Sequence, residues 1–184
     1  MEPMTLILAT LAGGVALFIW GALCWMVLPH HHGDFRGCSD EGAVSAGLRK
    51  GTAGPGAYWL PFHSNYAGGV KDPAYHARHS EGPNAIVVVY PAGPCMVGST
   101  FLMGFLLNLG TAFLAMALFA PLRDAMPGLL NRLLVFAGLG ALVHAVPLFQ
   151  QSLWLRWPWR NTLTCVFDGI VGFALLGAVA HFLT

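Results

Sequence analysis

"MTLILATLAGGVALFIWGALCWMVLPHHHGDFRGC", residues 4–38, contains the point at which this chain changes from apolar to polar. Residues 4–28 include no charged side chain, and a helix needs about 20 apolar residues to cross a bilayer. The run is too long, and too poor in N-terminal Lys and Arg, for a cleaved signal peptide. We therefore expect a membrane-spanning helix that ends at Pro29 and is followed directly by three histidines.

The composition of the whole chain agrees with a membrane protein. Of its 184 residues, 56% are hydrophobic and 9% are charged, whereas soluble domains carry about 25% charged residues. Residues 97–120, 129–149 and 162–183 form three further apolar stretches of spanning length. The net charge of +1 comes without a basic patch, so we expect no nucleic-acid partner. The sequence predicts an all-α membrane protein with a four-helix transmembrane bundle.

The links and the small residues indicate how these helices pack. Pro121 and Pro127 bracket a tight link, which predicts that the second and third helices are antiparallel neighbours. Small residues let helix backbones approach closely in a membrane. Such residues recur in the spans as Ala9 and Gly13, Ala137 and Ala141, and Ala174 and Ala178, together with further glycines.

Residues 29–96, between the first two helices, form the one large polar segment. "SDEGAVSAGLRKG", residues 39–51, predicts a short helix with Ser39 as its N-cap. "AYWLPF" and "NAIVVVYP" predict two strands of a hairpin, and residues 63–82 between them have no periodicity and are expected to form a long loop. The predicted organisation is helix one in residues 1–28, a small α+β extramembrane capping insert in 29–96, and helices two to four in 97–184.

Three strongly polar side chains lie away from the ends of the predicted spans. Asn108 lies in helix two, His144 in helix three and Asp168 in helix four. Polar groups inside a membrane are costly and are functional candidates by default. Antiparallel third and fourth helices would place His144 and Asp168 at similar depth, where they could pair. Such a pair would act as a proton relay or cofactor ligand, or would only fix the register of the helices.

The histidines outside the spans are candidate metal ligands. His30, His32 and Asp34 alternate, so an extended chain would point them to one side and His31 to the other. Imidazole with carboxylate suits Zn²⁺ or Cu²⁺. The alternative is a solvated histidine cluster just beyond the membrane edge. The candidate metal ligands are His30, His32, Asp34, His63, His76 and His79.

Aromatic and basic residues gather where the predicted helices meet the membrane surface. Indole rings favour the headgroup level, and arginines there meet lipid phosphates. The expected anchors are Trp20, Trp25, Trp154, Trp157, Trp159, Arg156 and Arg160.

The side of the membrane on which the insert lies also bears on the state of the cysteines. The short links carry equal numbers of basic residues, and the composition of the insert favours its placement on the periplasmic side of a bacterial inner membrane. Cys24 and Cys165 fall in apolar runs and are expected to be small core residues. Cys38 and Cys95 lie in the insert, and the sequence leaves open whether they form a disulfide there.

Four short motifs carry a resemblance to a known group of proteins. "FIWGALCWMVLP", "SDEGAVSAGL", "GAYWLP" and "CVFDGIVGF" resemble segments of small, uncharacterised four-span bacterial inner-membrane proteins. Those proteins usually have one Trp-His pair after the Leu-Pro, where this chain has three histidines. The resemblance implies the fold and the membrane location, and it brings no activity.

Two classes of function follow from these features. The chain has no Walker loop, GxSxG, HExxH or dinucleotide motif, so we do not expect an enzyme. The first class is an accessory subunit of a respiratory, photosynthetic or other electron-transfer complex, with other membrane subunits and the lipid bilayer as partners. The second is a stand-alone metal-handling or proton-coupled membrane protein. The sequence leaves open Cu or Zn binding and contacts with bound lipid or pigment.

Overall fold

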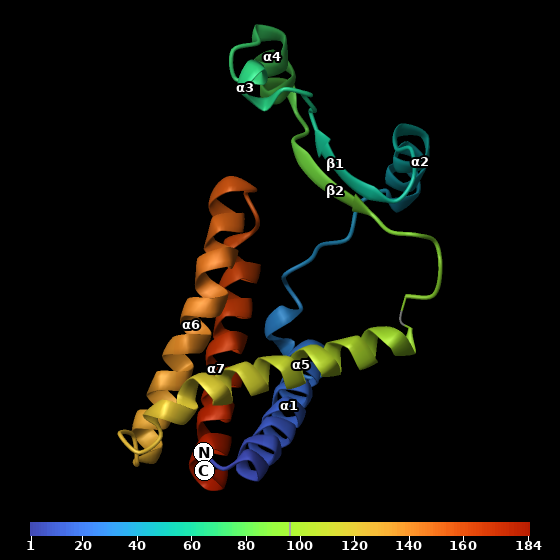
Figure 1. Ribbon diagram of the computed structural model, residues 1–184. Coiled ribbons are helices and arrows are strands. Elements are labelled where there is room, and N and C mark those ends of the chain that lie inside the picture. Colours follow the sequence, from blue (N-terminus) through green and yellow to red (C-terminus); the bar gives the residue numbers. More distant parts are fainter. Residues whose placement is uncertain (96) are drawn as a thin grey trace. The chain divides into compact units, whose positions relative to one another are not determined.

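A computed structural model describes residues 1–95 and 97–184, and it is mostly helical (Figure 1). The four helices expected from the sequence are present, each long and apolar enough to cross a membrane. They are α1 (Pro3–Met26), α5 (Gly98–Phe119), α6 (Leu129–Trp154) and α7 (Trp159–Leu183). By this criterion the chain is a multi-pass membrane protein.

The chain forms two compact units. The first contains residues 1–35 and 97–184, which include all four long helices, and the second is Arg36–Cys95. Residues 29–35, which the sequence analysis assigned to the insert, therefore belong to the unit of the long helices.

The helices of the first unit pack where glycines allow close approach. In α6, a Cβ on Gly140 would lie 2.6 Å from the carbonyl oxygen of Gly169 in α7. In α1, a Cβ on Gly14 would lie 3.0 Å from the Cα of Leu109 in α5. These contacts join α6 to α7 and α1 to α5, and α1 also packs on α7. Each crossing needs glycine at this position, because any side chain would push the two backbones apart.

The expected pairing of the second and third helices is largely wrong. Phe119 of α5 and Phe136 of α6 contact each other near the link, with ring centroids 5.2 Å apart. Away from the link the two helices diverge (Figure 1), and neither has its main packing partner in the other. The prolines shorten the connection, but the glycines decide which faces meet.

The apolar core lies at one end of the first unit, where the N- and C-termini are close together (Figure 1). Its fully buried members include Met116, Phe136 and Leu176. Arg132 is also buried at this end, and its guanidinium Nη1 donates to the carbonyl of Ala180 at 2.6 Å. The opposite end, where α1 leaves the membrane-spanning region, contains the polar residues described below.

The second unit contains a two-stranded sheet and three short helices. The elements are α2 (Glu41–Gly51), β1 (Gly56–Leu60), α3 (Tyr66–Gly69), α4 (Pro73–Glu81) and β2 (Ala85–Val89). The strands are antiparallel, with Gly56 opposite Val89 and Leu60 opposite Ala85.

Two sequence expectations for this unit are wrong. The N-cap of α2 is Asp40, whose carboxylate accepts from the amide of Ala43 at 2.8 Å, and not Ser39. Residues 63–82 are not an irregular loop, because they contain α3 and α4. Asp72 caps α4 and Pro73 occupies its first turn. This pair of residues is a typical helix start, although the segment that follows has no apolar periodicity.

Candidate functional site

The site begins at the turn that follows α1. Pro29–His31 forms a short 3-10 helix, η1, instead of an extended segment. The alternation expected for His30, His32 and Asp34 is therefore wrong, because period-2 alternation requires extended backbone. His30 and His31 both reach the same partner, and His32 is exposed.

That partner is Asp168 of α7. His30 Nε2 lies 2.8 Å from Asp168 Oδ1, and His31 Nε2 lies 2.6 Å from Oδ2. Each oxygen of the Asp168 carboxylate thus lies within hydrogen-bond distance of one imidazole. The indole of Trp20 donates to the backbone carbonyl of Asp168 at 2.9 Å, which holds α1 against α7 at this level.

A second carboxylate, Asp34, completes the network. His31 Nδ1 lies 2.6 Å from Asp34 Oδ2, so the ring of His31 bridges two carboxylates. The same Oδ2 accepts from Asn161 at 2.9 Å and from Thr164 at 3.0 Å, both on α7. Arg160 Nε lies 3.3 Å from Oδ1, which is an ion-pair distance. The Asp34 side chain is completely buried, so all its compensation comes from these neighbours.

The network favours charged forms of both bridging groups. Burial by itself lowers the pKa of His31, but its hydrogen bonds to Asp34 and Asp168 and their charges outweigh burial and raise that pKa above the usual value. Burial raises the pKa of Asp34, but hydrogen bonds from His31, Asn161 and Thr164 outweigh it and lower the pKa. An imidazolium at His31 and a carboxylate at Asp34 therefore stabilise each other.

Two packing contacts hold the turn in place. The rings of Trp25 and His31 are stacked, with centroids 3.9 Å apart and planes 7° apart. The guanidinium of Arg160 lies against Gly33, where an added Cβ would come within 2.8 Å of its Cζ, and it donates to the carbonyl of His30 at 3.0 Å. Trp25 and Arg160 were expected to be lipid anchors, and here they also support the site.

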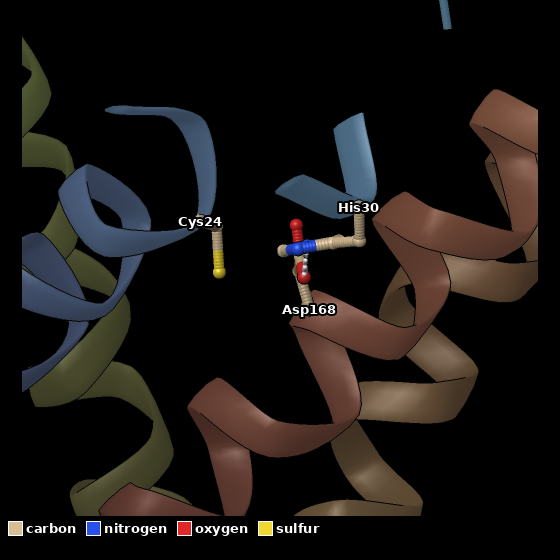
Figure 2. Close-up of side chains that lie close together, drawn as sticks. All are labelled: Cys24, His30 and Asp168. Atoms are coloured by element: carbon tan, nitrogen blue, oxygen red, sulfur yellow. Dashed lines mark hydrogen bonds and ion pairs between the residues drawn. The ribbon is translucent and has the colours of Figure 1, made fainter. Parts of the chain in front are cut away.

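Cys24, His30 and Asp168 bring three metal-ligating atoms together (Figure 2). The thiol sulfur, a ring nitrogen and a carboxylate oxygen all lie within 4.8 Å of one another. Cys24 is buried, whereas the His30 side chain is 25% exposed. Among the described residues no other group of three or more His, Cys, Asp or Glu side chains converges in this way.

Below Asp168, toward the middle of the long helices, lies a cavity of about 370 Å³. Asp168, His144 and Asn108 all line it. His144 Nδ1 lies 2.9 Å from the carbonyl of Gly140, one turn earlier in α6. The expected hydrogen bond between His144 and Asp168 does not occur among the described residues, because His30 and His31 occupy both oxygens of Asp168. The two helices do place His144 and Asp168 on one cavity.

The other candidate histidines lie in the Arg36–Cys95 unit and surround Tyr75. The ring centroids of His63, His76 and His79 are 5.4, 6.4 and 4.9 Å from that of Tyr75. His76 Nε2 lies 2.6 Å from the carbonyl of Val70. The three rings therefore pack on an aromatic side chain, and their nitrogens do not converge as a ligand group.

The remaining predicted anchors are exposed at the link between α6 and α7. The side chains of Trp154, Trp157 and Trp159 are 76%, 38% and 47% exposed. Trp157 donates to Asn161, which in turn donates to Asp34, so this anchor is connected to the site. Arg156, in the same link, has a left-handed backbone with φ of 55°.

Four residues of the site were missed from the sequence. Cys24 is buried as expected but also belongs to the site, His31 points toward Asp168 and not away from it, and Asn161 and Thr164 carry no sequence signal of their own. Their signal was positional: all four lie within one or two turns of the same membrane edge as Asp168. Cys38 and Cys95, outside this group, are exposed and free.

Comparisons with protein-family models, with curated protein sequences and with solved structures found no match. The site is therefore interpreted from its own geometry.

Proposed function

We propose that this chain is a metal-handling membrane protein that binds Zn²⁺ or Cu²⁺ through Cys24, His30 and Asp168. The observation that carries the proposal is the convergence of a thiol, an imidazole and a carboxylate within 4.8 Å. Thiolate and imidazole select borderline and soft transition metals, and a carboxylate is tolerated by the same ions. Three protein ligands leave a fourth position for water or for a ligand that delivers or removes the ion.

The spacing of the three atoms suits this role. Any two ligand atoms of a tetrahedral zinc site lie about 3.5 Å apart, given bond lengths of about 2.0–2.3 Å. The hydrogen bond of 2.8 Å between His30 and Asp168 already holds two ligands closer than that. Rotation of the Cys24 side chain would bring the third into place. Binding would replace the hydrogen bond with two bonds to the metal, and the thiol of Cys24 would release its proton to water as its sulfur becomes the third ligand.

The neighbours of the three ligands support the same interpretation. In metal sites a ligating carboxylate or imidazole is normally oriented by hydrogen bonds from residues behind it. Asp168 has such a partner in His31, which is itself held by Asp34 at 2.6 Å. The partly exposed His30 gives an ion from the aqueous side access to the buried thiol of Cys24.

Elemental analysis and metal titration test the proposal directly. The protein, purified in mild detergent without added chelator, is expected to contain close to one equivalent of Zn or Cu. The chain with Cys38→Ser and Cys95→Ser, which removes the exposed thiols, should bind Zn²⁺ in competition with a chelating dye. In that background Cys24→Ser and His30→Gln should weaken binding by more than the roughly 10- to 100-fold typical of outer-shell changes.

Matched controls separate the site from other thiols and imidazoles. Cys165→Ser removes a thiol near the same cavity, and His32→Gln removes the exposed neighbour of His30. Both should leave the affinity for Zn²⁺ unchanged. Equal binding by Cys24→Ser, His30→Gln and the two controls would refute the site.

We propose in addition that the four long helices form a transmembrane bundle in a bacterial inner membrane, with Arg36–Cys95 on the periplasmic side. The polar site would then lie at the periplasmic edge, where metal ions arrive from outside. Cysteine labelling of intact spheroplasts tests the side, because Cys38 and Cys95 are exposed. Labelling by an impermeant maleimide is expected, and protection until the membrane is opened would reverse the orientation.

A second candidate is the accessory subunit of a larger bacterial membrane complex, such as an electron-transfer assembly. The observation that favours it is an apolar face of the two-stranded sheet, on which Trp59, Ile86 and Val88 are 39%, 37% and 52% exposed. Exposed apolar patches of this kind mark interaction surfaces. Purification in mild detergent tests it: stoichiometric co-purifying chains that are lost in Val88→Lys would support the role, and a chain that runs alone would reject it.

A further inference from the structure

The cavity beneath Asp168 is a wedge between helices that do not pack on each other. It is lined by the middle of α5 and the C-terminal half of α6, together with residues of α1 and α7. Leu107 of α5 and Val143 of α6, both on its lining, are 72% and 49% exposed, so its mouth faces the side of the helices. In a membrane that side is occupied by lipid. The cavity is therefore accessible to molecules dissolved in the bilayer.

The cavity presents polar groups that have no partner in the protein. No hydrogen bond among the described residues uses the side chain of Asn108 or of Thr111. His144 Nδ1 faces the carbonyl of Gly140, which can only accept, so Nδ1 carries the proton. In the neutral ring Nε2 is then an acceptor without a donor. Polar groups left unsatisfied in an apolar medium are costly.

The rest of the lining is aromatic and aliphatic. It includes Trp20, Trp25, Leu17 and Phe173, and the volume of about 370 Å³ falls in the range of small-ligand pockets. Water could satisfy the polar groups, but it would leave these apolar walls wet. A ligand that fills the cavity needs a flat apolar body, a hydroxyl donor for His144 and a second oxygen for Asn108 or Thr111.

We propose that this cavity binds a membrane-dissolved quinol, meaning an aromatic ring with two hydroxyl groups and an apolar tail. One hydroxyl donates to His144 Nε2, and the other oxygen meets the amide of Asn108. The tail leaves between Leu107 and Val143 toward the lipid. The oxidised quinone has no hydroxyl to donate, so the cavity prefers the reduced form. Binding does not require the metal proposed at Cys24, His30 and Asp168.

Ligand-dependent thermal stability tests the proposal. The detergent-solubilised protein is melted in EDTA, under argon, with a decyl-substituted benzohydroquinone, with the matching quinone, and with the dimethyl ether of the hydroquinone. A ligand that binds the folded state raises the melting temperature, and at equal ligand concentration the rise grows with the logarithm of the affinity. The hydroquinone should give the largest shift, with a Kd roughly 3- to 10-fold below that of the quinone, as expected for one hydrogen bond. The ether should give the smallest shift.

Variants place the ligand in the cavity. His144→Phe keeps a ring beside Phe173 and removes the acceptor, and Asn108→Leu keeps the size and removes the amide. Each should raise the Kd of the hydroquinone by roughly 3- to 10-fold, while Asn131→Leu, an exposed asparagine at the start of α6, should not. The melting temperature without ligand shows whether each variant is folded.

Three results would overturn the proposal. Equal shifts by hydroquinone and its dimethyl ether would mean that the cavity takes apolar chains, such as lipid tails, only. Equal affinities in the wild type, His144→Phe and Asn108→Leu would place the ligand elsewhere. No shift with any ring compound would mean that water or lipid fills the cavity. Because EDTA is present throughout, none of these results depends on the metal site.

Discussion

The two ends of the four-helix unit each bury a basic side chain, and they do so in different ways. At the end near the termini, Arg132 donates to the carbonyls of Met126 and Ala180 at 2.7 and 2.6 Å and to the hydroxyl of Thr184 at 2.9 Å. At the other end, His31 is held between the carboxylates of Asp34 and Asp168. The acceptors of Arg132 are all neutral, whereas those of His31 are charged.

The difference shows which end contains groups that can change their protonation. Arg132 satisfies backbone carbonyls at the end of α7 and in the link before α6, and its guanidinium lies 5.2 Å from the ring of Phe119. The charge of Arg132 does not change with pH, because arginine stays protonated. The His31 end consists of groups that can exchange protons or ligate a metal. Both Arg132 and His31 are buried, so burial does not distinguish the two ends. The hydrogen-bond acceptors of the two side chains do distinguish them.

The largest expected effect comes from removing Asp34. In Asp34→Leu the His31 imidazolium loses one of its two carboxylates and Arg160 loses its ion-pair partner. Breaking a buried pair from one side costs about 3–5 kcal/mol. The free energy of unfolding, measured by denaturant titration in mixed micelles, should fall by that amount. A loss of less than about 1 kcal/mol would mean that the network is not formed, because that is the level of an exposed ion pair.

Arg132→Met should cost less. It removes several hydrogen bonds but leaves no charge without a partner, and interhelical hydrogen bonds in membranes average about 0.6 kcal/mol each. We expect a loss of about 2 kcal/mol in the free energy of unfolding from the bonds to Met126, Ala180 and Thr184 together. The loss should be the same at pH 5.5 and at pH 8.5. A pH-dependent loss would show that this end is coupled to a titrating group.

The pH dependence of stability should come from the His31 end. The pKa of folded His31 is raised, so its contribution is complete below about pH 6.5, the pKa of an unfolded histidine. That contribution is lost as the pH rises through the raised value. The pKa of folded Asp34 is lowered, so its contribution is complete above about pH 3.9 and is lost as the pH falls through the lowered value. Both are present in full between about pH 4 and 6.5.

Melting temperatures measured in EDTA between pH 4 and 9 test this directly. The wild type should be most stable near pH 5–6 and should lose stability above pH 7. In His31→Gln the decline above pH 7 should flatten, and in Arg132→Met it should keep the slope of the wild type. A His31→Gln profile parallel to the wild type would assign the titration to another group.

The smallest expected effect is that of Thr164→Val. The hydroxyl of Thr164 lies 3.0 Å from Asp34 Oδ2 and 2.8 Å from the carbonyl of Asn161, and it can donate its one proton to either. Valine keeps the shape of threonine and removes this donor. Asp34 retains its bonds to His31 and Asn161, so the change should cost about 1 kcal/mol, the net value of one hydrogen bond. Thr10→Val, in α1, is a useful control because the Thr10 hydroxyl is buried without a hydrogen-bond partner among the described residues. Equal losses in the two variants would mean that the bond to Asp34 contributes nothing.

Much of the fold could be read from the sequence because membrane spans depend on composition alone. A run of about 20 apolar residues without charge specifies a spanning helix whatever it packs against. The helices α1, α5, α6 and α7 therefore lie where they were expected. Of the two strands of the insert, β2 lies within its expected segment, and β1 begins one residue before its own.

The candidate site could be read only in part. Asp168 and His144 stood out because polar groups in apolar runs are rare, and both line the cavity. The partner of Asp168 was chosen wrongly because equal depth on adjacent helices does not say which side chains point toward each other. Cys24 could not be recognised as a site residue, because a cysteine in an apolar run usually fills space. His31 could not be recognised, because alternation predicts side-chain directions only for extended backbone, and Pro29–His31 is a turn of 3-10 helix.

The sequence by itself therefore determined that this chain has four spanning helices, a small polar insert and a few costly polar groups near one membrane edge. These properties are local, since each follows from the residues of one segment and their transfer into lipid. Only the tertiary structure decided that Gly140 and Gly169 bring α6 onto α7, and that the turn Pro29–His31 aims two imidazoles at Asp168. The contacts of His30 and His31 with Asp168 join residues more than 130 positions apart. Like the glycine contacts, they depend on which helix faces meet, and they also need a single turn of backbone.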